Sequence, residues 1–187
     1  YRAGLAEVVK YGVIADAKFF KFLETNYKKI INLDHKLLTH IVETSCTIKA
    51  SVVEKDERES HYRMILNFGH TFGHAIESLT EYSQFVHGEA VAIGMVLATK
   101  LSHSAGKCSE DVPKRLEALL KNLGLPVDMP ALNSSAVIKS LYHDKKTVEN
   151  KIKFILVKEI GSIEIVDQVS EAEILKVLRA NLVVTER

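Results

Sequence analysis

The sequence predicts a mainly α domain, built from several helices, with one small β-hairpin near the C-terminus. Apolar residues recur at helical spacing along most of the chain, and an alternating apolar pattern takes over between residues 152 and 165. A chain of 187 residues with 47% hydrophobic and 26% charged residues is typical of one globular domain with a packed core. We therefore expect residues 1–187 to form a single helical domain.

The N-terminal part is predicted to contain two helices. Apolar residues at helical spacing predict the first helix over residues 3–26. Asp34 is a candidate N-cap for the second helix, which ends in the charged run 54–59.

A third helix is predicted over residues 65–79, although it contains Gly69 and Gly73. Each glycine costs a helix about 1 kcal/mol relative to alanine. Two glycines one turn apart therefore indicate that another backbone or a ligand approaches closely there.

The next two helices follow from burial and from capping signals. Residues 89–101 are apolar on nearly all sides, which predicts a buried helix that ends before Gly106. Ser109 is a candidate N-cap for the following helix, which tolerates Pro113 in its first turn and ends at Gly124.

The C-terminal part contains the predicted hairpin. A short helix over residues 136–142 precedes it, and a last helix over residues 172–182 follows it. Ile152, Phe154 and Leu156 form one alternating run, and a second run follows a turn at Gly161.

Charge and cysteine content limit the classes of function. The net charge of +1 gives no overall attraction to nucleic acid or to a membrane, and no stretch is long and apolar enough to cross a bilayer. Cys46 and Cys108 are far apart and belong to no Cys-x-x-Cys unit, so a disulfide framework is not expected and a reducing, cytoplasmic location is favoured. Both cysteines are expected to be buried small hydrophobes. A Gly-rich dinucleotide motif and a Walker loop are absent from the sequence. The chain starts at Tyr1 without an initiator methionine, which indicates a fragment of a longer protein.

One acidic residue and three histidines are candidate metal ligands: Glu7, His70, His74 and His87. His70 and His74 are one helical turn apart, a spacing found both in metal sites and on ordinary polar helix faces. A Glu/His/His set leaves one coordination position open, as in catalytic zinc sites. The spacing leaves open whether His70, His74 or both bind the metal, because a neutral imidazole can also transfer protons.

Cationic side chains accompany these histidines. Lys10 shares a helical face with Glu7, and Arg63 and Asn67 continue the line of His70 and His74 along the predicted third helix. Lysine and arginine beside a metal suit a phosphate or carboxylate substrate, whereas a lone lysine is usually a solvated surface residue. The other candidate cations are Lys49, Lys145 and Lys146.

The motifs that carry these residues resemble the C-terminal half of the 3-dehydroquinate synthase family. The most specific one is LNFGHTFGHAIE at residues 66–77. The others, in the same order as in the family, are AGLAEVVKYG at 3–12, DERESHYR at 56–63, HGEAVA at 87–92 and DKK at 144–146. One departure is His61-Tyr62, where the family pattern has Gly-Leu; neither position carries an assigned role.

The resemblance implies a role for each candidate residue. It makes Glu7, His70 and His87 the zinc ligands, and it assigns proton transfer to His74 and Glu59. The implied catalytic residues are His74, Glu59 and Lys10. The implied substrate-binding residues are Lys10, Lys49, Arg63, Asn67, His74 and Lys145.

The resemblance also implies an activity and its cofactors. A family member is a lyase of the shikimate pathway that converts 3-deoxy-arabino-heptulosonate 7-phosphate into 3-dehydroquinate and phosphate. It uses Zn²⁺, or another divalent metal such as Co²⁺, together with NAD that is bound mainly by an N-terminal α/β domain. That domain is missing from this chain, so we expect the isolated chain to be inactive and the full-length enzyme to be a homodimer.

Two alternatives remain open at this point. One is a related sugar-phosphate cyclase such as 2-deoxy-scyllo-inosose synthase, which acts on a substrate without a carboxylate. The other is a non-catalytic helical module, in which both His70 and His74 would help to close a four-ligand structural metal site. Alcohol and glycerol dehydrogenases are disfavoured, because Lys10, Arg63 and Lys145 indicate an anionic substrate.

Overall fold

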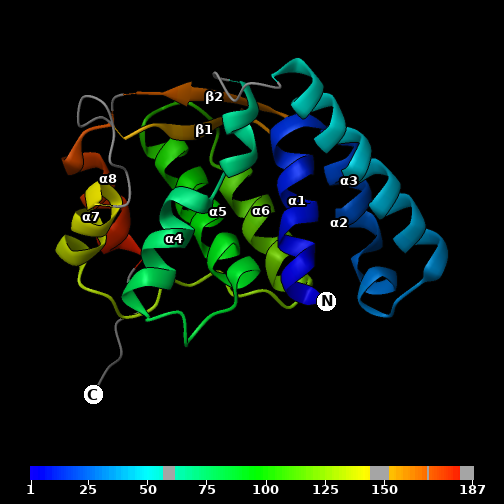
Figure 1. Ribbon diagram of the computed structural model, residues 1–187, viewed down its shortest axis with the longest axis horizontal. Helices are drawn as coiled ribbons and strands as arrows, with labels where there is room; N and C mark the ends of the chain where they lie inside the picture. Colours follow the sequence, from blue (N-terminus) through cyan, green and yellow to red (C-terminus); the bar gives the residue numbers. More distant parts are fainter. Residues whose placement is uncertain (57–61, 144–151, 168, 182–187) are drawn as a thin grey trace.

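The computed structural model describes residues 1–56, 62–143, 152–167 and 169–181, which form a helical domain with one hairpin (Figure 1). This confirms the predicted fold class. The helices are α1 (Arg2–Ala15), α2 (Ala17–Ile31), α3 (His35–Lys55), the 3₁₀ helix η1 (Tyr62–Asn67), α4 (His70–Leu79), α5 (His87–Ser104), α6 (Asp111–Asn122), α7 (Ser134–His143) and α8 (Glu171–Ala180). The strands are β1 (Phe154–Glu159) and β2 (Ser162–Val166).

The centre of the domain is α5. Thirteen of its 18 residues are buried, and it contacts α1, α4, α6, α8 and β1 (Figure 1). A helix that is apolar on nearly all sides is stable only when other elements surround it, so the prediction of a buried helix is confirmed. It begins at His87, two residues earlier than expected.

The single helix predicted over residues 3–26 is wrong, because Asp16 divides it into α1 and α2. Asp16 has an extended backbone, with φ −148°, and its carboxylate accepts hydrogen bonds from the N–H groups of Lys18 and Phe19 at 2.9 Å. An aspartate that caps the next helix competes with continuation of the preceding one. As a result α2 turns back beside α1 (Figure 1).

The helix predicted over residues 65–79 is also divided, and Arg63 and Asn67 therefore do not share a helix with His70. The first part is the 3₁₀ helix η1, and α4 begins only at His70, after Gly69. Gly69 has φ +81°, in the left-handed region that favours glycine. The predicted polar line along one α-helix does not exist, although its residues remain neighbours across the break.

The expectation that the paired glycines allow a close backbone approach is confirmed. A Cβ on Gly69 would lie 2.9 Å from the backbone nitrogen of Met95, and a Cβ on Gly73 would lie 3.3 Å from the carbonyl oxygen of Ala90. Both contacts are with α5. The glycines therefore let α4 pack directly against the central helix.

The hairpin is confirmed as an antiparallel pair in which Phe154 faces Val166 and Ile155 faces Ile165. It lies along one edge of the helices (Figure 1). The turn residue Gly161, at φ +90°, donates its N–H to the carbonyl of Val13 at 2.8 Å. The hairpin is thereby attached to the end of α1.

Ser109 was expected to cap a helix, but α6 begins at Asp111 and its N-cap, Glu110, makes no side-chain capping hydrogen bond. Cys46 is exposed rather than buried, and Cys108 is half-buried. Among the described residues, no helix is long and apolar enough to cross a membrane.

Candidate active site

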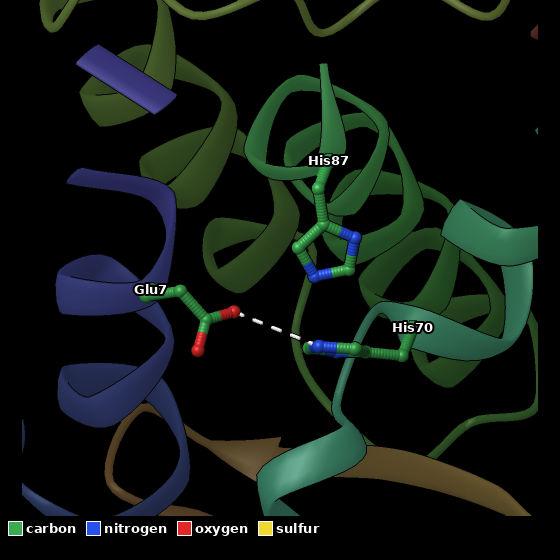
Figure 2. A group of neighbouring side chains, drawn as sticks. All are labelled: Glu7, His70 and His87. Atoms are coloured by element: carbon green, nitrogen blue, oxygen red, sulfur yellow. Dashed lines mark ion pairs between the residues drawn. The ribbon is translucent and has the colours of Figure 1, made fainter. Parts of the chain in front are cut away.

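Three side chains from three different elements meet at one point. Glu7 projects from α1, His70 is the first residue of α4 and His87 is the first residue of α5. One ligand atom from each lies within 4.8 Å of the others, and Glu7 Oε1 is 3.6 Å from His70 Nε2. Figure 2 shows the carboxylate directed at the two imidazoles. We call Glu7, His70 and His87 the ligand cluster.

Close backbone contacts bring these three elements together. A Cβ on Gly88 would lie 2.0 Å from the carbonyl oxygen of Ala3, so the start of α5 touches the start of α1. A Cβ on Gly94 would lie 2.1 Å from the carbonyl oxygen of Gly69, so the start of α4 touches the middle of α5. The ligand cluster therefore depends on positions where only glycine fits.

The protonation of His70 leaves a lone pair directed at Glu7. Its Nδ1 lies 3.2 Å from the carbonyl oxygen of Phe68, which can only accept, so Nδ1 carries the proton and Nε2 does not. Burial lowers the pKa of His70, and the nearby charge of Lys10 lowers it further. The ring is therefore neutral near pH 7 and able to bind a metal.

Glu7 supplies the test of whether a cation fits. Its Oε1 is buried and has no hydrogen-bond partner among the described residues, while it faces the unprotonated Nε2 of His70. Two acceptors that face each other in a buried site are stabilised by a cation between them. Carboxylate and imidazole are ordinary ligands of zinc, so the donor set fits a divalent metal.

His87 lies against a carboxylate that was not among the predicted site residues. Its Nδ1 lies 3.1 Å from Oε1 of Glu77, which is buried in α4. The other ring nitrogen points toward Glu7 and His70 (Figure 2). Glu77 stands seven residues after His70 and three after His74, so helical spacing alone places it on their face.

His74 lies beside the ligand cluster and is exposed. The centre of its ring is 5.6 Å from that of His70 and 6.1 Å from that of His87. With Glu77 and His87 it forms a second group whose ligand atoms lie within 4.8 Å of one another. The structure thus offers two groups of metal-ligating side chains that share His87.

A cationic cavity of about 380 Å³ opens on one side of the ligand cluster. It brings together the predicted anion-binding residues from α1, α3 and η1, because α3 and η1 both pack against α1. Its lining residues are Glu7, Lys10, Tyr11, Lys49, Arg63, Met64, Leu66, Asn67 and His70.

Lys10 is the buried cation of this cavity, with only 3% of the residue exposed. Its Nζ donates to Glu7 Oε2 at 2.6 Å. Burial lowers the pKa of Lys10, the charge of Glu7 raises it, and the neighbouring charge of Lys49 lowers it again. The net result is a pKa below the usual value, which makes Lys10 a better proton donor than an exposed lysine.

Arg63 is placed by a contact across the end of α3. Its backbone N–H donates to the Asp56 carboxylate at 3.0 Å, and Asp56 is buried. This contact ties the start of η1 to the residue that follows α3. Lys49 and Asn67 are exposed, so their polar ends are available to a bound anion.

A second cavity, of about 850 Å³, lies on the other side of His87. It is formed between α4 and α7, and the second group of metal-ligating side chains is part of its lining. Its lining residues are His74, Glu77, Ser78, Leu79, Tyr82, His87, Ala136, Lys139 and Ser140.

The remaining predicted site residues, Glu59 and Lys145, lie outside the described residues, as does Lys146. Every other predicted site residue contacts one of the two cavities or the ligand cluster.

Known structures share this fold. The chain superposes with a TM-score of 0.85 on 2-epi-5-epi-valiolone synthase from Streptomyces hygroscopicus subsp. jinggangensis with NAD⁺ and Zn²⁺ bound, at 26% identity, over 96% of this chain and 50% of that one. It superposes with a TM-score of 0.77 on 2-deoxy-scyllo-inosose synthase complexed with carbaglucose-6-phosphate, NAD⁺ and Co²⁺, at 28% identity, over 97% of this chain and 51% of that one. The fold and site define a helical domain of the sugar-phosphate cyclase class.

The sequence comparison defines the family within this class. The 3-dehydroquinate synthase C-terminal domain model matches residues 4–147, and the chain belongs to this family. A 3-dehydroquinate synthase from Desulforamulus reducens is 52% identical over 178 residues, which are 95% of this chain and 50% of the relative. One from Thermodesulfovibrio yellowstonii is 49% identical over 94% of this chain and 49% of the relative. The chain thus spans about half the length of the relatives that it matches.

Proposed function

We propose that this chain is the metal- and substrate-binding half of a 3-dehydroquinate synthase, a lyase that releases phosphate from 3-deoxy-arabino-heptulosonate 7-phosphate. The observation that carries this proposal is the position of the ligand cluster beside the cationic cavity. Glu7 and His70 belong to both the ligand cluster and the lining of the cavity, so a metal bound by the cluster would lie next to an anionic substrate in the cavity.

Glu7, His70 and His87 would hold the metal. Three protein ligands leave a position for a substrate oxygen, which is the arrangement of a catalytic site. A divalent cation bound there stabilises negative charge on the substrate hydroxyl that is to be oxidised. The buried, unpartnered Oε1 of Glu7 and the neutral His70 support this assignment.

The cationic cavity would hold the substrate's anionic groups. Arg63 presents a planar pair of N–H donors that matches a carboxylate or phosphate, and Lys49 adds a second charge. Asn67 can donate through its side-chain amide. Binding at several points orients the substrate before reaction, which lowers the entropic part of the barrier.

Lys10 and His74 would move protons. Lys10 is buried against Glu7, and its lowered pKa favours proton donation. His74 lies on the exposed side of the ligand cluster, where an imidazole can exchange protons with substrate and solvent. Glu59 and Lys145 keep the proton-transfer and substrate-binding roles predicted from the sequence.

The proposal includes an N-terminal NAD-binding α/β domain in the full-length protein, which we expect to be a homodimer. The NAD⁺ in two related cyclase structures supports a requirement for this cofactor. The 187-residue chain alone would then bind NAD poorly and turn over nothing.

The test is phosphate release by the full-length protein that contains this chain. We expect release from 3-deoxy-arabino-heptulosonate 7-phosphate that depends on both NAD and a divalent metal, and no turnover of a hexose 6-phosphate, which lacks the carboxylate. Turnover of the hexose phosphate alone would identify a related cyclase instead. Turnover by the isolated chain would contradict the division of labour between two halves.

A further inference from the structure

Glu77 is a buried carboxylate that none of the roles above uses. It lies in the second turn of α4, and its side chain is only 9% exposed. An ionised group in this position is costly unless hydrogen bonds stabilise it. The structure provides such a bond, since Glu77 Oε1 lies 3.1 Å from Nδ1 of His87.

The orientation of the His87 ring depends on a side-chain contact, whereas that of His70 does not. The His87 side chain is 52% exposed, and among the described residues its ring makes a hydrogen bond only to Glu77. By contrast, the Nδ1 of His70 is held by the backbone carbonyl of Phe68, and the ring is mostly buried. Glu77 is therefore the side chain that limits rotation of His87.

The hydrogen bond also decides which nitrogen of His87 has a lone pair. A carboxylate accepts, so Nδ1 of a neutral His87 carries the proton and Nε2 is left unprotonated. That nitrogen points toward Glu7 and His70 (Figure 2). A carboxylate behind an imidazole also makes the imidazole a stronger metal ligand.

We propose that Glu77 is a positioning residue of the metal centre, which fixes the orientation and tautomer of His87 for binding through Nε2. The inference rests on the proposed metal site formed by Glu7, His70 and His87. Glu77 acts through His87 and touches neither metal nor substrate.

The competing arrangement is a second metal ion bound by His74, Glu77 and His87. The hydrogen bond makes this less favourable, because a second ion would have to displace the proton that Nδ1 of His87 shares with Glu77. The two arrangements differ in metal stoichiometry, so the same experiment separates them.

The experiment is a zinc titration of the metal-free chain, with a competing chelator that gives the affinity and the stoichiometry. We expect the wild type to bind one zinc, Glu77→Gln to bind it about 10-fold more weakly and Glu77→Ala up to about 100-fold more weakly. The matched control is Glu89→Gln. Glu89 lies in the first turn of α5, as His87 does, and its carboxylate accepts a hydrogen bond from the N–H of Val86. Glutamine at this position retains an oxygen that can accept the same bond. This variant should bind zinc like the wild type.

A second measurement does not depend on zinc binding. The ¹⁵N chemical shifts of His87 in the metal-free chain should show a proton on Nδ1 in the wild type and a mixture of tautomers in Glu77→Gln. Circular dichroism on each variant verifies that the helices remain folded, so a loss of affinity is not a loss of the fold.

Each remaining outcome is decisive. Unchanged affinity and an unchanged tautomer in Glu77→Gln would overturn the inference while leaving the metal site intact. Two zinc ions in the wild type, with one lost in Glu77→Gln, would make Glu77 a metal ligand and overturn the positioning role. No zinc binding by the wild type would contradict the proposed metal site itself, and the inference with it.

Discussion

At the scale of single residues, the two oxygens of Glu7 have different surroundings. Oε2 accepts a hydrogen bond from Lys10 at 2.6 Å, whereas Oε1 is buried without a hydrogen-bond partner in the described part of the chain. The lysine holds the carboxylate in place, and the second oxygen remains for a ligand. This asymmetry distinguishes Glu7 from a carboxylate that only forms an ion pair.

The first prediction separates metal ligands from proton-transfer residues. Glu7→Ala should remove bound zinc from the chain, and His74→Ala should retain it, because His74 stands outside the ligand cluster. Elemental analysis after dialysis measures both. Loss of zinc in His74→Ala together with retention in Glu7→Ala would favour the second group of ligands and a structural role for the metal.

The second prediction concerns the pH dependence of the metal-free chain. Burial lowers the pKa of His70 in the folded chain below its usual value of about 6.5, so the unfolded chain binds this proton more readily. The free energy of unfolding should therefore fall as the pH drops below about 6.5. Denaturant unfolding at several pH values measures this slope.

A variant assigns that slope to His70. In His70→Gln the decline below about pH 6.5 should be shallower than in the wild type. Equal slopes in wild type and His70→Gln would contradict the role of burial at this position.

At the scale of elements, the close contact between α4 and α5 controls the site. His70 and His87 are the first residues of these two helices, so their separation follows from how the helices pack. Gly94 in the middle of α5 lies under the turn that begins α4. A larger residue at that position would separate the two helices and, with them, the two histidines.

The third prediction tests this contact. Gly94→Ala should destabilise the chain by about 3 kcal/mol and weaken metal binding, because the new Cβ would lie 2.1 Å from the carbonyl oxygen of Gly69. The matched control is Gly4→Ala in α1, where a Cβ meets nothing within 4 Å. There alanine should stabilise the helix by about 0.5 kcal/mol. Thermal and denaturant unfolding measure both, and equal effects would refute the proposed packing.

At the scale of the whole molecule, a buried hydroxyl links the hairpin to the central helix, against which β1 packs. Ser102 of α5 donates to the carbonyl of Ala98 at 2.7 Å and accepts from the N–H of Val157 at 2.9 Å. Both Ser102 and Val157 are fully buried. The strand β1 therefore has a backbone N–H that is satisfied by a residue 55 positions away.

The fourth prediction follows from that contact. Ser102→Ala should destabilise the chain by about 2 kcal/mol, because it leaves the buried N–H of Val157 without an acceptor. Ser109→Ala should change stability by less than about 0.5 kcal/mol, since Ser109 is exposed and its expected capping role is not observed. A comparable loss in both variants, measured by denaturant unfolding, would contradict this description of the hairpin contact.

Much of the architecture was predictable from local patterns. Helical spacing of apolar residues depends on neighbours three or four positions apart, and alternation in the hairpin depends on neighbours two apart, so both are visible in the sequence. The buried character of α5 was predicted on these grounds, whereas the close approach at Gly69 and Gly73 was predicted from the cost of two glycines in a helix. The helix breaks at Asp16 and Gly69 were missed, because the apolar periodicity continues across them although the helical backbone conformation is interrupted there.

The sequence by itself determined the fold class, the family motifs and the residue types able to bind a metal and an anion. The tertiary structure decided the contacts themselves: how closely Glu7, His70 and His87 approach one another, the burial of Lys10 against Glu7 and the hydrogen bond between His87 and Glu77. These contacts join residues on different helices. Their distances depend on packing between helices, and residue spacing along one helix gives no information about that packing.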